Sequence, residues 1–201
     1  LLACAAFVAA PLSAQTIAIT GGKLVIGDGS APIENGTVVV TNGRVVAAGA
    51  NVAVPAGAER IDATGKWVTP GIVAGFTRLG LVGVDAVDGS NDAEARGTPF
   101  NASLDISPAV NADVAAMAVN RAAGVTRAIV SPDAGNAIFA GQGAVVDTGA
   151  DFNPVTKSKV FEFVEFGETG ARLAGGSRPA LLAAFRNALG EASDAAKGIF
   201  H

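Results

Sequence analysis

The sequence is poor in the residues that most often mark a catalytic or metal site. Among 201 residues it contains one histidine, His201, and one cysteine, Cys4. A serine nucleophile needs a neighbouring base, so Ser131 and Ser177 are not candidate nucleophiles in this chain. A single cysteine also excludes a disulfide within the chain, so the packed core alone must hold the fold together.

Charge is sparse as well. Only 16% of the residues are charged, the net charge is −4, and Lys and Arg form no cluster. The sequence therefore gives little electrostatic reason to bind nucleic acid or an anionic membrane. It also lacks an internal repeat of roughly 20–50 residues, which argues against a solenoid or propeller.

Hydrophobic residues and glycine are abundant. Half of the residues are hydrophobic and 26 are glycine, which is typical of a globular protein with a core and many turns. The length suits one large domain or two small ones. The sequence does not begin with Met, and a helical pattern runs into residues 198–201 without a stop signal. We therefore expect a fragment.

Residues 1–14 predict a signal peptide that lacks its basic start. Residues 1–12 are apolar and Ser13-Ala14 are small, whereas a membrane span needs about 20 apolar residues. We expect an exported bacterial protein, periplasmic or secreted, without a transmembrane segment. One alternative is a lipoprotein anchored through Cys4, although residues 5–12 stay apolar where a polar tether would follow. Another is a buried first strand or helix.

Residues 16–68 alternate short apolar runs with turn residues, which predicts a small all-β unit. One run, 16–20, ends at Gly21-Gly22, and the next covers residues 23–26. Asn-Gly pairs at 35–36 and 42–43 favour type I′ hairpin turns, because both central residues of such turns need positive φ. The expected strands are residues 16–20, 23–26, 37–41, 44–48, 61–63 and 66–68.

After Pro70 the pattern changes to strands and helices. Helices are expected at 107–123, ended by Gly124, and at 178–197, capped by Ser177. A turn is expected at Gly141-Gln142-Gly143 and a polar, acidic loop at 83–100. The expected strands are a buried one at 72–81 and others at 125–130, 143–148 and 158–166. This order predicts βα units on a parallel sheet.

Several segments together resemble the amidohydrolase superfamily, in particular its imidazolonepropionase-like, exported bacterial members. Thr69-Pro70-Gly71-Ile72-Val73 stands where that family enters its barrel, and Leu79-Gly80 follows at the family's spacing. The other matching segments are residues 19–29, 35–40, 43–49, 61–68 and 122–126. The match covers roughly residues 16–130 and is specific as a set.

The resemblance implies an α/β fold in two parts. Residues 15–68 would form part of a composite β-sandwich, and residues 69–201 the first part of a truncated (β/α)8 TIM-type barrel. Family members are metal-dependent hydrolases that act on non-peptide carbon–nitrogen bonds in cyclic amides and related compounds. Zinc or another divalent metal is therefore implied for the full-length protein, although no cofactor is evident in this chain.

The family's first metal pair is replaced. The family pattern has His-x-His here, and two imidazoles two residues apart on a strand point at one ion. This chain has Phe76 and Arg78 at those positions. A phenyl ring cannot ligate a metal, and a protonated guanidinium repels one. No metal ligand can be assigned to this sequence, and its catalytic residues are unknown.

Two other groups are candidate binding residues. Arg78, with Thr77 beside it, is a candidate for binding a substrate carboxylate or phosphate, and the alternative is an ion pair between Arg78 and a loop acid. The acids Asp85, Asp88, Asp92 and Glu94 suggest a calcium site, but their spacing fits no EF-hand, so a solvated acidic loop is favoured.

These observations leave two main functional hypotheses. The first is an amidohydrolase-type enzyme with an altered metal site, completed by residues beyond His201 and acting on a small molecule. The second is a catalytically inactive relative that binds a ligand or assembles with a partner, and a homo-oligomer is compatible with either. An unrelated β-sandwich-plus-α/β binding protein is the remaining alternative.

Overall fold

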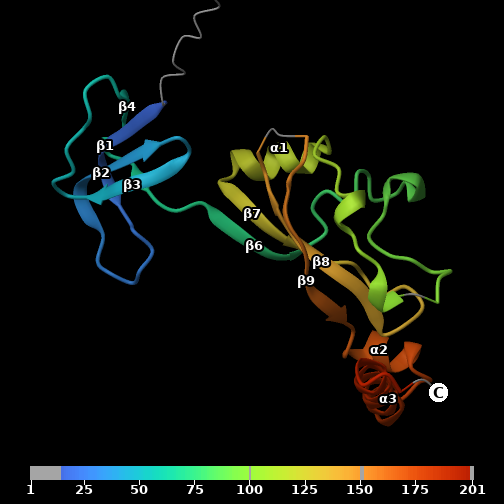
Figure 1. Cartoon of the computed structure of the whole chain (residues 1–201). Coiled ribbons are helices and arrows are strands. Elements are labelled where there is room, and N and C mark those ends of the chain that lie inside the picture. Colours follow the sequence, from blue (N-terminus) through green and yellow to red (C-terminus); the bar gives the residue numbers. More distant parts are fainter. Residues whose placement is uncertain (1–14, 100, 150–151, 200–201) are drawn as a thin grey trace, which may run out of the picture. The chain divides into compact units, whose positions relative to one another are not determined.

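The computed structural model describes residues 15–99, 101–149 and 152–199, which form two compact units (Figure 1). The first unit ends at Pro70 and the second begins at Gly71. The proposed signal peptide, the Cys4 anchor and the first-strand alternative lie outside the described residues. The chain is a mixed α/β protein with two sheets and few helices.

The first unit is a five-stranded sheet in the order β3-β2-β1-β4, with β5 also paired to β1. Strand β1 pairs antiparallel with β2 and parallel with β4 and β5. Val38 and Val39 of β2 and Ala18 and Leu24 of β1 are buried. The strands are β1 (Thr16–Leu24), β2 (Ile33–Thr41), β3 (Arg44–Gly49), β4 (Glu59–Asp62) and β5 (Trp67–Val68).

One of the two Asn-Gly pairs forms the predicted hairpin turn. Asn42 and Gly43 have φ values of 51° and 72° and join β2 to β3, as a type I′ turn requires. The other prediction is wrong: Asn35-Gly36 lies inside β2. Gly36 is there because a Cβ at that position would stand 2.5 Å from the Cβ of Leu24.

Gly21-Gly22 likewise lies inside a strand instead of ending one. The runs predicted at residues 16–20 and 23–26 are one strand, β1, whose pairing with β2 shifts register between Thr20 and Leu24. Gly21 has φ 77°, which is the geometry of a β-bulge at glycine. Beyond this bulge β1 stops pairing with β4 and pairs with β5.

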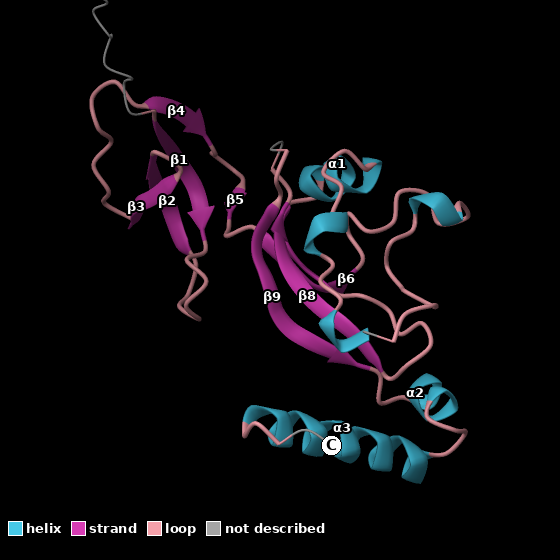
Figure 2. Cartoon of the chain, turned by 45° about the vertical axis from the view of Figure 1, so that its right-hand side comes forward, coloured by secondary structure: helices cyan, strands magenta, loops and turns pink. Residues whose placement is uncertain are grey.

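The second unit is built on a four-stranded sheet in the order β6-β7-β8-β9. Its two long strands, β8 and β9, lie side by side in Figure 2. Strands β6 (Ile72–Thr77) and β7 (Val125–Val130) are parallel. Strands β8 (Phe139–Asp147) and β9 (Val155–Val164) are antiparallel neighbours. The prediction of a wholly parallel sheet is therefore wrong for β8 and β9, because no helix separates β7, β8 and β9 and each simply reverses direction.

Strand β6 is also shorter and more exposed than predicted. It ends at Thr77 instead of residue 81, and its side chains at Ile72 and Val73 are 57% and 60% exposed. The apolar run does not mark a strand buried on both faces, because the described residues cover only one face of this sheet.

The helix predicted at residues 107–123 begins later. A single 3-10 turn, η3 (Ser107–Ala109), is followed by an extended Val110 and then by α1 (Ala115–Ala122). Asn111 interrupts the pattern, because its side-chain oxygen accepts the backbone N–H of Asp113 and favours a turn over helix. Gly124 stops the helix with φ 91°, as predicted.

The C-terminal helices follow β9. Helix α3 (Arg178–Ala196) begins as predicted, with Ser177 accepting the backbone N–H of Ala180 at 3.3 Å. Before it lies α2 (Glu168–Leu173), which the sequence pattern did not indicate. Phe185 of α3 packs against Phe139 and Phe166, with ring centroids 6.1 and 4.8 Å apart. In the described part of the chain, no helix is both long and apolar enough to span a bilayer.

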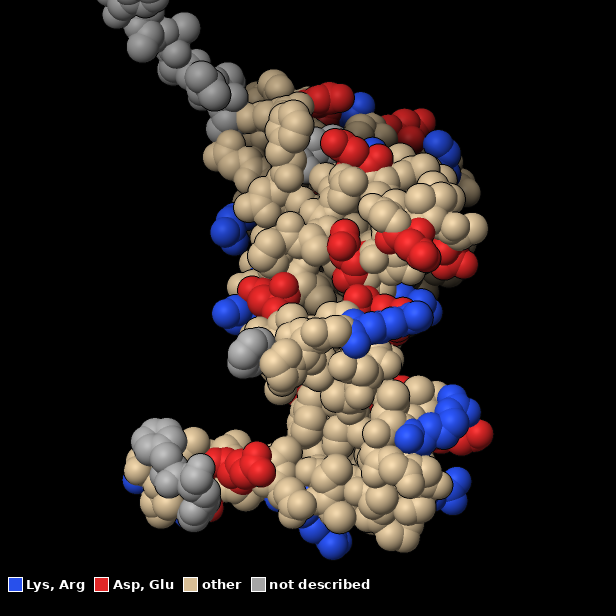
Figure 3. Space-filling model, turned by 90° about the vertical axis from the view of Figure 1, so that its right-hand side faces the viewer, with Lys and Arg blue, Asp and Glu red and all other residues tan. Residues whose placement is uncertain are grey.

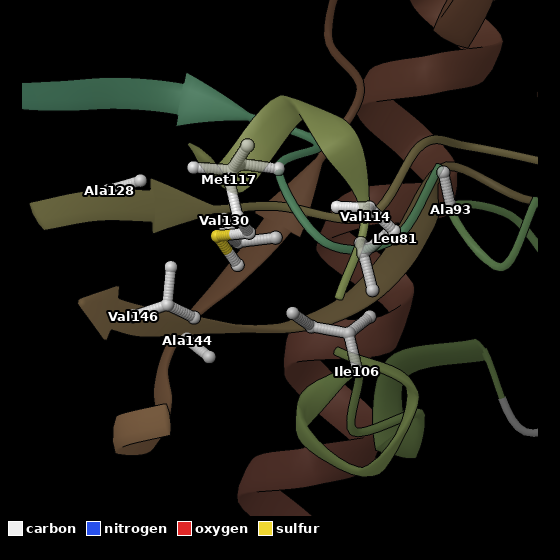
Figure 4. Packing of buried hydrophobic residues seen from close by; sticks show 10 residues of the cluster. Leu81, Ala93, Ile106, Val114, Met117, Ala128, Val130, Ala144 and Val146 are labelled. Carbon is white, nitrogen blue, oxygen red and sulfur yellow. The ribbon is translucent and has the colours of Figure 1, made fainter. Parts of the chain in front are cut away.

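The core of the second unit lies on one face of its sheet (Figure 4). Ala128, Val130, Ala144 and Val146 point from β7 and β8 toward Met117 of α1. The loop after β6 and the segment before α1 complete the cluster with Leu79, Leu81, Ala93, Ile106 and Val114. Because side chains alternate along a strand, the residues between these core positions face the opposite side of the sheet.

Candidate functional site

The carboxyl ends of β6 and β7 bring the candidate residues to one edge of the second sheet. The backbone N–H of Ser131, just after β7, donates to the carbonyl of Thr77 at the end of β6 at 2.9 Å. Phe76 lies in β6 and Arg78 follows it, while Asp133 follows β7. Parallel strands with a helical connection place such residues together, so this edge is the candidate site.

Phe76 has an unusual backbone. Its φ is 50°, in the left-handed region that costs a residue with a Cβ roughly 1–2 kcal/mol. The pairing of β6 with β7 is irregular between Ala74 and Thr77, where Phe76 lies. Its ring is 73% exposed. Phe76 is therefore held outward on the face of the sheet away from the core.

Two rings from β9 meet Phe76 across that face. The centroids of Phe161 and Phe163 lie 6.2 and 6.5 Å from the centroid of Phe76, at interplanar angles of 62° and 58°. These distances and tilts are typical of favourable edge-to-face aromatic pairs. We call Phe76, Phe161 and Phe163 the aromatic triad. It joins the two outer strands of a four-stranded sheet, so the sheet curves toward that face.

Gly143 in β8 makes room for the triad. Gly143 and Gly141 are the cross-strand partners of Phe161 and Phe163. A Cβ at Gly143 would overlap the Phe161 ring, so that ring lies directly on the β8 backbone. The turn predicted at Gly141-Gln142-Gly143 is wrong because these residues belong to β8. Two phenylalanines two apart in one strand, which therefore share a face, were the sequence signal for this arrangement.

Arg78 forms an ion pair, as the alternative interpretation of the sequence predicted, but with a different partner. Its guanidinium lies 2.7 Å from a carboxylate oxygen of Asp133, with the two side chains 54% and 40% exposed. The predicted alternative, a pair with one of the acids in the 83–100 loop, is therefore wrong as to its partner. At this exposure the pair contributes at most about 1 kcal/mol.

Thr77 makes only local contacts. Its hydroxyl donates to the carbonyl of Ile129 at 3.4 Å and accepts the backbone N–H of Leu79 at 3.3 Å. Thr77 is the cross-strand partner of Val130, which places it on the core face of the sheet. The geometry gives Thr77 a role in ending β6, and its proposed contact with a substrate stays a prediction.

The loop acids do not converge on one point. Asp85, Asp88 and Asp92 are exposed, and Glu94 pairs with Arg96. The loop is ordered by Ser90, whose hydroxyl accepts the backbone N–H of Val84 at 3.0 Å. Acidic and basic side chains lie among one another on the face shown in Figure 3.

The residues present do not fit the metal that the family resemblance implies. Phe76 has no donor atom, and Arg78 brings a positive charge that is already paired with Asp133. Within residues 15–99, 101–149 and 152–199, no group of three or more His, Cys, Asp or Glu side chains is placed to hold a metal ion.

Comparison with known proteins finds a solved structure with a similar fold, but no matching family model and no matching curated protein. An amidohydrolase from Thermotoga maritima MSB8 superposes with a TM-score of 0.80 at 22% identity, over 90% of this chain and 49% of that one. Molinate hydrolase matches at 37% identity over 33% of this chain and 15% of its own, with a TM-score of 0.30.

The Thermotoga maritima match establishes the class of fold. At 22% identity it shows that this chain shares the fold of an amidohydrolase chain. The chain spans about half the length of that protein.

Proposed function

We propose that this chain is the N-terminal part of an amidohydrolase-superfamily protein of the imidazolonepropionase-like kind. The observation that carries the proposal is the TM-score of 0.80 to an amidohydrolase over 90% of the chain. The segments around Thr69-Pro70-Gly71 and at residues 122–126 support it, because they stand at the ends of β5 and α1 and lead into β6 and β7.

The proposal includes a (β/α)8 barrel completed by residues beyond His201. Strand β6, helix α1 and strand β7 form one βα unit with its helix against the core face, which is the repeating unit of such a barrel. The coverage of only 49% of the Thermotoga maritima chain agrees with this. The β8–β9 hairpin would be an insertion that departs from the regular pattern.

We further propose an exported protein that hydrolyses non-peptide carbon–nitrogen bonds in small cyclic amides. The barrel mouth in this fold class lies at the carboxyl ends of the strands, where Phe76, Arg78 and Asp133 gather. Since Phe76 and Arg78 are not metal ligands, any zinc would have to be held by residues that the rest of the protein supplies.

The test uses the protein encoded by the complete reading frame. It is purified from a periplasmic fraction, its zinc is measured by mass spectrometry, and hydrolysis of a panel of cyclic amides is followed. We expect bound zinc and turnover of at least one cyclic amide. A protein that binds no metal and turns over no amide would contradict the hydrolase assignment.

A second candidate function is a catalytically inactive binding or assembly protein. The Arg78–Asp133 pair and the exposed Phe76 ring favour it, because they occupy the edge where the family's first metal pair would stand. One bound equivalent of zinc in the complete protein would exclude this candidate.

A further inference from the structure

The ion pair between Arg78 and Asp133 lies just beyond the carboxyl ends of β6 and β7 and adds little to the stability of the fold. Its guanidinium and carboxylate groups are 2.7 Å apart, and the two side chains are 54% and 40% exposed. Water therefore screens the pair. It lies at the edge where barrels of the proposed kind carry their active sites. This position makes the pair a candidate for contact with a ligand.

The backbone holds both residues of the pair in place. The carbonyl of Arg78 accepts the N–H of Leu81 at 2.9 Å, in a turn that contains Gly80 with a φ of 88°. The N–H of Asp133 donates to the carbonyl of Ala93 at 2.7 Å. Both side chains therefore start from fixed points, which reduces the entropy that is lost when a ligand binds them.

The two side chains can bind a ligand without giving up their ion pair. That pair uses one nitrogen of Arg78 and one oxygen of Asp133. A guanidinium has further N–H donors, and a carboxylate has a second oxygen and further acceptor positions. The pair therefore offers a donor and an acceptor side by side.

The charges near the pair favour an uncharged ligand. Arg78 and Asp133 cancel each other, and Ala93, which binds the Asp133 backbone, lines a cavity of about 210 Å³. Among the described residues, the charged ones that line this cavity are Asp92, Glu94 and Asp105. Arg96 and Lys159 pair with the last two of these acids. The remaining charge is negative, which disfavours a carboxylate or phosphate.

A cyclic amide is an uncharged group that matches a donor beside an acceptor. In an open-chain amide the C–N bond is trans, so the N–H and the C=O point in opposite directions. A small ring holds the same bond in the cis form and turns both groups to one side. The N–H can then donate to Asp133 while the C=O accepts from Arg78.

We propose that Arg78 and Asp133 together bind the cis-amide group of a small uncharged lactam. Arg78 donates to the carbonyl oxygen of the lactam, and Asp133 accepts its N–H. The proposal rests on the proposed function, because ring amides are the substrates proposed there. It adds the two residues that select a ring amide with a free N–H over an open-chain or N-alkylated amide.

The test uses the protein encoded by the complete reading frame and compares three probes: 2-pyrrolidone, N-methyl-2-pyrrolidone and N-methylacetamide. Dissociation constants are measured by saturation-transfer NMR. We expect 2-pyrrolidone to bind about tenfold or more tightly than the other two, because each of those loses one hydrogen bond to a charged side chain. Similar constants for the three probes, or no binding of 2-pyrrolidone, would overturn the proposal without any variant.

Asp133→Asn assigns the preference to the pair, because it removes the charged acceptor and keeps the size of the side chain. It should weaken binding of 2-pyrrolidone by about tenfold and leave N-methyl-2-pyrrolidone unchanged, whereas an unfolded variant would lose both. The matched control is Asp147→Asn, since Asp147 pairs with Arg127 at 3.2 Å in the same sheet. A preference that survives in Asp133→Asn, or disappears in Asp147→Asn, would contradict the assignment.

The outcomes for this site and for the hydrolase proposal can be told apart. Turnover of cyclic amides by a protein without a preference among the probes would overturn this inference and leave the hydrolase proposal standing. The expected preference without any turnover would support the site and count against the hydrolase proposal.

Discussion

The strained residue at the candidate site makes a stability prediction. Phe76 is mostly exposed, so truncating it loses little packing, while its φ of 50° penalises any side chain. Glycine alone escapes that penalty. We expect Phe76→Gly to be more stable than Phe76→Ala by about 1 kcal/mol, measured by urea titration with pulse proteolysis. Equal stabilities of Phe76→Gly and Phe76→Ala would show that the backbone at residue 76 leaves the positive-φ region in the alanine variant.

Close packing at Gly143 gives a second prediction. A methyl group there would overlap the Phe161 ring, so Gly143→Ala should destabilise the chain by about 1–3 kcal/mol through overpacking. Gly75→Ala in β6 is the control, because nothing lies within 4 Å of its Cβ position. The double variant Gly143→Ala/Phe161→Ala should recover part of the loss. If the losses of stability in the two single variants simply add up in the double variant, a direct contact between residue 143 and the Phe161 ring is contradicted.

Glu162 of β9 introduces a pH dependence. Partial burial raises the pKa of its carboxyl above the ordinary 4.5, although the residue stays exposed at the surface, and a backbone hydrogen bond at Gly141 opposes the rise in part. A pKa raised in the folded state means that stability is lost as the pH rises through that pKa and is retained below 4.5.

Glu162→Gln should therefore be more stable than wild type at pH 7, and the gain should shrink as the pH falls toward 4.5. The measurement is the urea midpoint at each pH. The control is Glu191→Gln, which removes the same charge from an exposed position on α3. A gain from Glu162→Gln that is independent of pH would show that burial of the charge is not its cause.

The candidate site was only partly predictable from the sequence. The positions of Phe76 and Arg78 followed from the spacing after Thr69-Pro70-Gly71 and from the family pattern. Their partners did not: Asp133 lies 55 residues beyond Arg78 in the sequence, and Phe161 is farther still from Phe76. Contacts of that range depend on the order of strands in the sheet, which periodicity does not encode.

At the scale of elements, the cap of α3 can be tested directly. Ser177 accepts the backbone N–H of Ala180, one of the donors that a helix start leaves unpaired. Ser177→Ala should cost about 1 kcal/mol and speed amide exchange in the first turn, as measured by hydrogen exchange. Ser193→Ala, on the exposed side of the same helix, should be neutral or slightly stabilising. An unchanged first turn in Ser177→Ala would contradict the cap.

Elements whose bounds depend on neighbouring residues in the sequence were predicted well. Elements whose bounds depend on contacts with distant residues were not. Strand β7 has the predicted bounds of residues 125–130, because β-branched residues fill it and Gly124 and Pro132 bracket it. Glycine misled the prediction at residues 21–22, 36 and 141–143. Each of these glycines lies within a strand, where it accommodates a bulge or a neighbouring side chain and does not mark a turn.

At the scale of the whole molecule, the sheet of the second unit is open at both edges. In the described residues, β6 pairs with β7 alone and β9 with β8 alone, so each presents an unpaired edge. The face carrying Val73, Phe76 and the other triad rings is covered by no described element. An open edge beside an exposed apolar face is the usual origin of strand-to-strand aggregation.

We therefore expect the isolated 201-residue chain to be poorly soluble or to aggregate. Association should increase with concentration in static light scattering. It should be relieved when the chain is expressed with the complete reading frame, because the strands of the proposed barrel would then cover the open sheet. Phe76→Asp should reduce association by placing a charge on the exposed face. A soluble monomer with one cooperative thermal transition would contradict the expectation and would mean that the second unit is stable with its sheet open.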